Sequence, residues 1–151
     1  MLLLECKADE TLVRCLGMVR RDCRHLDDKG EVCNWLKRHS ELLAMIDEDP
    51  ASAQPPYLSG VKLLSDLHGI REFRDEARAH RILIVQPRLE EWLIACAAQA
   101  GLRMGNFGLS DRGNEFHKEI NSKLQAVTRL ITALEEAASP RIAHLRALLR
   151  G

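Results

Sequence analysis

The chain has 151 residues, of which 46% are hydrophobic and 29% are charged, with 22 basic and 22 acidic side chains. A chain of this length and composition can bury a continuous core as one domain, and it is neither a disordered tail nor a membrane protein. The absence of a basic excess argues against a stand-alone protein that grips nucleic acid over a wide surface, because such binding depends on many Lys and Arg contacts with phosphate. Any nucleic-acid role is therefore local or shared with a partner.

The opening segment and the cysteines indicate a cytoplasmic protein. Glu5 and Lys7 interrupt the first apolar run far short of the length of a targeting signal. The five cysteines are odd in number and form no CxxC pair, which argues against a disulfide framework and a zinc ribbon and predicts reduced thiols. Two spacings are compatible with zinc ligands but arise easily by chance: Cys23 with His25, and Cys33 with His39.

The first third of the chain alternates between strand and helix patterns. Residues 2–6 form a short apolar run typical of a buried strand, and residues 8–19 carry apolar side chains at the three- and four-residue spacings of a helix. Residues 20–26 are polar and favour at most a weak edge strand. A second helix is predicted up to His39, and residues 42–46 are a further buried strand that stops at acidic residues.

The middle of the chain continues this pattern after a loop. Residues 50–60 contain three prolines and a glycine and are incompatible with regular helix or central strand. A short amphipathic stretch at 61–67 and a strand at 70–73 come next. Residues 82–85 are rich in β-branched side chains, and they predict another strand, closed by a proline.

Helices dominate the remainder. Apolar side chains predict a helix over 89–101, a glycine-rich loop follows at 102–113, and one long helix is expected over 116–134. A last helix is predicted to start at Ser139-Pro140. The alternation predicts a single α/β domain over residues 1–151, with a mostly parallel sheet of four to five strands, helices on both faces, and a carboxyl-terminal helical segment at 114–151.

Acidic residues end two of the predicted strands. Glu5 ends the first, and Asp47 and Asp49 follow the buried strand at 42–46. In a parallel sheet these ends share one edge, where α/β folds bind ligands. Asp47 and Asp49 can point the same way while Glu48 faces elsewhere, and carboxylate oxygens suit Mg²⁺ or Mn²⁺. Acids after strands are also ordinary turn formers and helix caps, but their recurrence at two strand ends favours a metal site.

The order of strand, Glu5, two helices, strand and Asp47-Glu48-Asp49 resembles the TOPRIM domain of topoisomerases, primases, ribosomal-RNA maturases and overcoming-lysogenization-defect nucleases. The resemblance covers residues 1–101. It implies that Glu5 acts as general acid or base and as a metal ligand, and that Asp47 and Asp49 hold Mg²⁺. The family's first motif often has a glycine after its glutamate; here Glu5-Cys6-Lys7-Ala8-Asp9 keeps two acids, which makes Asp9 an auxiliary acid, and lacks that glycine.

A second motif extends the resemblance. Pro87-Arg88-Leu89-Glu90-Glu91-Trp92 is similar to a PxxExW signature of uncharacterised bacterial TOPRIM-like proteins, some encoded with ATPases in defence operons. The resemblance makes Glu90 a further auxiliary acid, although a first-turn glutamate also suits the helix dipole. Lys7 and Arg88 are candidates for phosphate binding, and exposed basic side chains are otherwise simply solvated.

These features predict a Mg²⁺- or Mn²⁺-dependent nuclease that cleaves DNA or RNA, assisted by a partner ATPase or by a second copy of the chain. One alternative is a non-catalytic interaction module that retains the fold and the acids. A second is a haloacid-dehalogenase-like phosphatase, but that family expects its DxD after the first strand, with Thr or Val where Ala51 stands here. The single tyrosine, Tyr57, is a conceivable nucleophile, although packing is the simpler role.

Overall fold

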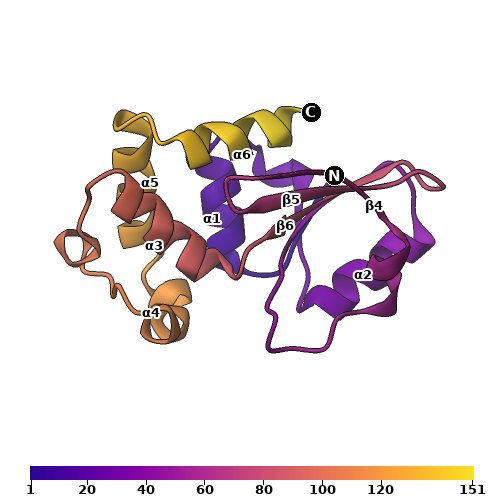
Figure 1. Ribbon diagram of the computed structural model, residues 1–151, viewed down its shortest axis with the longest axis horizontal. Helices are drawn as coiled ribbons and strands as arrows, with labels where there is room; N and C mark the ends of the chain where they lie inside the picture. The colour runs from indigo at the N-terminus through magenta and orange to yellow at the C-terminus, as the bar shows by residue number, and fades with distance from the viewer.

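The computed structural model describes residues 1–151 and shows an α/β fold with six strands and six α-helices (Figure 1). The strands are β1 (Leu2–Leu4), β2 (Cys23–His25), β3 (Leu43–Asp47), β4 (Lys62–Leu67), β5 (Ile70–Asp75) and β6 (His80–Val85). The helices are α1 (Lys7–Cys15), α2 (Lys29–Arg38), α3 (Leu89–Gln99), α4 (Gly113–Glu119), α5 (Leu124–Glu136) and α6 (Pro140–Arg150). None of these helices is long and apolar enough to cross a membrane.

The six strands form one mixed sheet in the order β2-β1-β3-β6-β5-β4. The first four strands in this order are parallel, as predicted, whereas β5 pairs antiparallel with both β6 and β4. The predicted count of four to five strands is wrong because the amphipathic stretch at 61–67 is strand β4. A tight turn at His68 and Gly69, both with positive φ, folds β4 back on β5 as a hairpin.

Helices cover both faces of the sheet. The chain runs from β1 through α1 to β2 on one side, then returns through α2 to β3 on the other side of β1. In β1, Leu2 and Leu4 enter the larger core with α1, α3, α5 and α6, while Leu3 enters a smaller core with α2. Figure 1 shows α2 apart from the group formed by α3, α4 and α5. The carboxyl-terminal helices therefore share a core with the sheet.

The long helix expected over 116–134 is wrong. A 3₁₀ turn at Ile120–Ser122 separates α4 from α5. Ser122 Oγ donates a hydrogen bond to the carbonyl of Glu119 at 2.8 Å, a local bond of the kind that competes with helix continuation. The break lets α5 pack along α1 while α4 turns toward the carboxyl ends of the parallel strands.

Candidate active site

The ends of β1 and β3 meet where the strand order reverses, and this is the place where open α/β sheets bind ligands. The two strands are parallel neighbours, with Leu4 opposite Met45. Glu5 follows β1 directly, and its Oε2 accepts a hydrogen bond from the backbone N–H of Asp47, the last residue of β3, at 2.8 Å. The structure thus brings together the two strand-end acids that lie 42 residues apart in the sequence.

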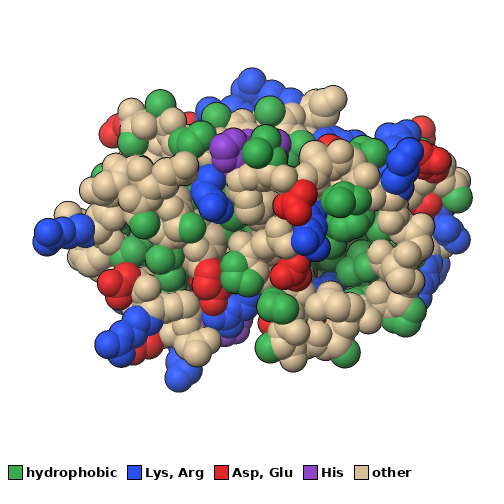
Figure 2. Space-filling model, viewed as in Figure 1, with side chains coloured by type: hydrophobic (Ala, Val, Ile, Leu, Met, Phe, Trp, Pro, Cys, Tyr) green, Lys and Arg blue, Asp and Glu red, His purple; other side chains and the backbone are tan.

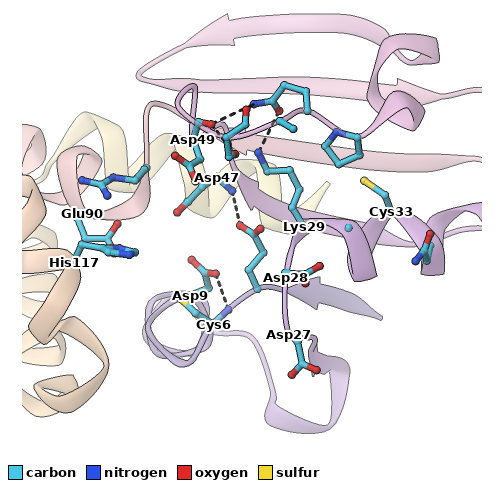
Figure 3. A pocket seen from close by; sticks show the side chains of 18 of the residues that line it. Cys6, Asp9, Asp27, Asp28, Lys29, Cys33, Asp47, Asp49, Glu90 and His117 are labelled. Carbon is cyan, nitrogen blue, oxygen red and sulfur yellow. Dashed lines mark hydrogen bonds and ion pairs between the residues drawn. The ribbon is translucent and has the colours of Figure 1, made fainter.

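A cavity of 710 Å³ opens at this edge of the sheet. Six of the seven side chains singled out from the sequence line it: Glu5, Asp9, Asp47, Asp49, Arg88 and Glu90. Figure 3 labels four of them, Asp9, Asp47, Asp49 and Glu90. The seventh, Lys7, is exposed on α1 and is not part of the lining. We call this cavity the acidic pocket, because five of its side chains are the carboxylates just named.

Burial and crowding disfavour ionisation of three of these carboxyls, those of Glu5, Asp9 and Asp47. Asp9 lies in the first turn of α1 and is only 2% exposed, and its Oδ2 accepts the N–H of Cys6 at 3.1 Å. Burial first, and then the charge of Glu5, raise the pKa of Asp9 well above its ordinary value. Burial, followed by repulsion from Asp9 and Glu5, likewise raises the pKa of Asp47, even though Leu89 donates its N–H to Asp47 Oδ1 at 3.0 Å. The pKa of Glu5 is also raised, mainly by burial.

Neighbouring acids at the end of β3 and in the loop after it lie beside different cavities. Asp49 lines the acidic pocket and has a positive φ of 44°, a conformation that Asp tolerates better than most residues. Its N–H donates to the carbonyl of Pro87 at 2.8 Å. Glu48 instead accepts a hydrogen bond from Gln86 at 2.6 Å and lies 3.7 Å from Arg71, beside a separate cavity. The structure therefore places Asp47 and Asp49 on one pocket and Glu48 outside it.

The carboxylates suit a hard divalent cation in their chemistry, although they do not converge into a ready-made cluster. No three His, Cys, Asp or Glu side chains are close enough to form a metal-binding group as they stand. Glu5, Asp9 and Asp47 each use one oxygen to accept a backbone N–H, and the other oxygen makes no hydrogen bond within the chain. Free oxygens on repelling carboxylates are the donors that Mg²⁺ and Mn²⁺ prefer, so the donor set fits these metals.

The opposite wall of the acidic pocket carries a buried lysine that the sequence did not single out. Lys29 begins α2, is 8% exposed, and is the only buried lysine or arginine in the chain. Its Nζ donates hydrogen bonds to the carbonyl of Glu48 at 2.7 Å and to Gln54 Oε1 at 3.2 Å. Its positive charge opposes the rise in the pKa of Glu5. The segment Asp27-Asp28-Lys29-Gly30 reads only as a turn, so no sequence signal pointed to this role.

His117 is the second residue that sequence patterns missed. It lies on α4, and its Nδ1 is 2.8 Å from Oε1 of Glu90 in the first turn of α3. Both side chains line the acidic pocket. Because His117 holds Oε1 of Glu90 and Oε2 is buried, we count only Glu5, Asp47, Asp49 and, as an auxiliary, Asp9 among the proposed metal ligands. A single histidine in a helix gives no local sign of such a contact.

The other sequence candidates have structural partners. The Arg88 guanidinium is paired with Glu91, with Nε 3.0 Å from each carboxylate oxygen, and also donates to Asn114 at 3.1 Å. Tyr57 donates its hydroxyl to Asp75 at 2.6 Å and packs on the smaller core, which is the simpler role expected for it. All five cysteines are free thiols.

Comparison with known proteins adds no family to this description. No protein-family model, curated protein or solved structure matches the chain. Function is therefore inferred from the residues of the acidic pocket and from the motifs of the sequence.

Proposed function

We propose that the chain is a metal-dependent phosphodiesterase of the TOPRIM-like kind, which cleaves DNA or RNA at the acidic pocket. Glu5, Asp47 and Asp49 are the proposed ligands of Mg²⁺ or Mn²⁺, and Asp9 assists them. The observation that carries the proposal is the 2.8 Å hydrogen bond between Glu5 and Asp47, because it fixes two strand-end acids at the ligand-binding edge of the sheet, each with an oxygen left free.

The residues of the acidic pocket have different roles in the proposed reaction. When bound, the metal neutralises charge on the scissile phosphate and lowers the pKa of an attacking water. Glu5 accepts the proton of that water. Lys29 supplies the one buried positive charge on the opposite wall and holds the loop after β3 through the carbonyl of Glu48.

A partner is part of the proposal. The chain has no net charge, and Figure 2 shows basic and acidic side chains intermingled on the face in view. Tight binding of nucleic acid therefore calls for an additional basic surface, since phosphate contacts supply most of the affinity. We propose that an ATPase or a second copy of this chain provides it.

One observation favours a second candidate, a non-catalytic interaction module. Strand β4 is at the edge of the sheet, and Leu63, Leu64 and Leu67 on it are each about half exposed, at 49%, 47% and 52%. Apolar side chains on an unpaired edge strand are typical of surfaces that receive another protein chain. This module requires neither a bound metal nor cleavage.

A cleavage assay distinguishes the nuclease from the interaction module. Purified protein is incubated with Mg²⁺ or Mn²⁺ and with labelled single- and double-stranded DNA and RNA. The nuclease proposal predicts metal-dependent cleavage by the wild type, loss of cleavage in Asp47→Ala, and retention in Glu48→Gln, whose side chain lies outside the acidic pocket. Equal background cleavage by the wild type and Asp47→Ala would leave the interaction module as the better candidate.

A further inference from the structure

The pair formed by Glu90 and His117 joins two helices at the acidic pocket. The residues are 27 positions apart in the sequence, and Nδ1 of His117 lies 2.8 Å from Oε1 of Glu90. Figure 3 shows them together on the side of the pocket next to Asp9 and Asp47, away from Lys29 and Cys33. His117 thus lies at the pocket that holds the proposed metal ligands, although no sequence motif includes it.

Glu90 is held in an environment that disfavours a lone carboxylate. The residue is 4% exposed, and its Oε2 is buried without any hydrogen-bond partner. Burying an acid with an unsatisfied oxygen costs free energy, so such a group calls for an explanation other than packing. The only side chain that contacts this carboxylate by a hydrogen bond is His117.

The imidazole of His117 is held at one nitrogen and open at the other. Its side chain is 58% exposed, and Nε2 makes no hydrogen bond within the chain. A carboxylate on Nδ1 fixes the orientation of the ring, as in catalytic carboxylate–histidine pairs. Of the other charged groups near the ring, Glu91 is already paired with Arg88. Nε2 is therefore the position from which a proton can reach a substrate.

We propose that His117, oriented by Glu90, is the general acid that protonates the leaving oxygen during phosphodiester hydrolysis. This inference rests on the proposed function. In the step, a water oxygen forms a bond to phosphorus and gives its proton to Glu5, while the bond from phosphorus to the leaving oxygen breaks. That oxygen takes the proton from Nε2 of His117. Glu90 does not touch substrate in this scheme and acts as a positioning residue.

Two substrates with different leaving groups test the proposal. An oligonucleotide releases a sugar alkoxide, which needs a proton, whereas the p-nitrophenyl ester of thymidine 5′-phosphate releases p-nitrophenolate, which does not. His117→Asn is expected to slow oligonucleotide cleavage by about a hundredfold or more and ester cleavage by less than about tenfold. Matching thermal unfolding curves of wild type and variant show that the fold is retained. Equal losses on both substrates, or no loss on either, overturn the role of His117.

The orientation by Glu90 has its own readout, which does not depend on activity. In ¹⁵N NMR of the metal-free protein, His117 is expected to show a hydrogen-bonded Nδ1–H, and Glu90→Gln is expected to shift the His117 signals. An unchanged His117 spectrum in Glu90→Gln overturns the positioning role. A wild type that cleaves neither substrate refutes the proposed nuclease itself. A wild type that cleaves both, with no selective loss in His117→Asn, refutes only the general acid.

Discussion

The carboxylate of Glu5 and the backbone N–H of Asp47 are joined by a 2.8 Å hydrogen bond that ties the end of β1 to the end of β3. This bond lies at the point where the strand order reverses, so the two acids share the edge of the sheet at which α/β folds bind ligands. The same closeness makes the acids repel each other. Charging all of these carboxyls therefore costs free energy, and a divalent cation bound there would offset the repulsion.

The first prediction concerns the charge of Asp47. Without metal, Asp47→Asn is expected to raise the free energy of unfolding at neutral pH by on the order of 1 kcal/mol. It replaces a carboxyl that the folded protein must either hold protonated or keep charged against burial and repulsion from Asp9 and Glu5. The same substitution is expected to abolish cleavage. Urea unfolding of the metal-free proteins checks the first effect, with Glu48→Gln as the control. A destabilised Asp47→Asn argues that its carboxylate is already satisfied by the protein.

The second prediction is a pH dependence of stability without metal. The pKa values of Asp9 and Asp47 are higher in the folded protein than in the unfolded chain. The two carboxyl groups therefore stabilise the fold at low pH, and this stabilisation is lost as pH rises through their pKa values in the folded protein. The melting temperature of the metal-free protein is expected to fall between about pH 5 and about pH 8. Added Mn²⁺ is expected to restore it at the higher pH. A melting temperature that rises over this window contradicts the described electrostatics.

Lys29 provides a third prediction. Replacing it with Met leaves the amide oxygen of Gln54 without a donor and leaves the carbonyl of Glu48 with Gln54 Nε2 as its only donor. It also removes the only buried positive charge near Glu5. Lys29→Met is expected to destabilise the protein by about 1–3 kcal/mol. Lys37→Met is the matched control, because Lys37 lines the same pocket from the same helix but is exposed. Similar stabilities of the two variants would show that burial of Lys29 contributes little.

The hairpin turn between β4 and β5 supports a fourth prediction. Gly69 has a φ of +73°, and a Cβ at this position lies 2.9 Å from Cδ1 of Trp92. Gly17 also has a positive φ, of +103°, but its Cβ position is open. Both alanine substitutions are expected to lower the free energy of unfolding, because alanine disfavours a positive φ. Only Gly69→Ala also places a Cβ against Trp92, which we expect to lower it by about 1–3 kcal/mol more. Chemical denaturation of both variants measures the difference, and equal losses contradict a close approach of Gly69 to Trp92.

The parallel part of the fold could be predicted from the sequence because its signals are local. Each buried parallel strand is a short apolar run, and parallel order alone brings the acids after β1 and β3 to one edge. Strand β4 escaped prediction because Val61, Leu64 and Leu67 recur every three residues, as on a helix face. Only pairing with β5 across the turn at His68 makes this segment a strand.

The remaining parts of the site depend on tertiary contacts. His117 reaches Glu90 because the chain breaks between α4 and α5, and nothing in the sequence near His117 specifies its partner. Lys29 is buried by the loop that follows β3, and Gln54 in that loop completes its contacts. Short-range patterns therefore located the acids, whereas Lys29 and His117 could be placed at the site only from the folded chain.

Binding of Mn²⁺ followed by electron paramagnetic resonance tests the central claim most directly, because it observes the metal without requiring a substrate or a partner. The metal-free wild type is titrated beside Asp47→Ala and the control Glu48→Gln. We expect saturable loss of the free Mn²⁺ signal with the wild type and with Glu48→Gln, and little loss with Asp47→Ala. A wild type that binds Mn²⁺ no better than Asp47→Ala would contradict a metal centre at Glu5, Asp47 and Asp49.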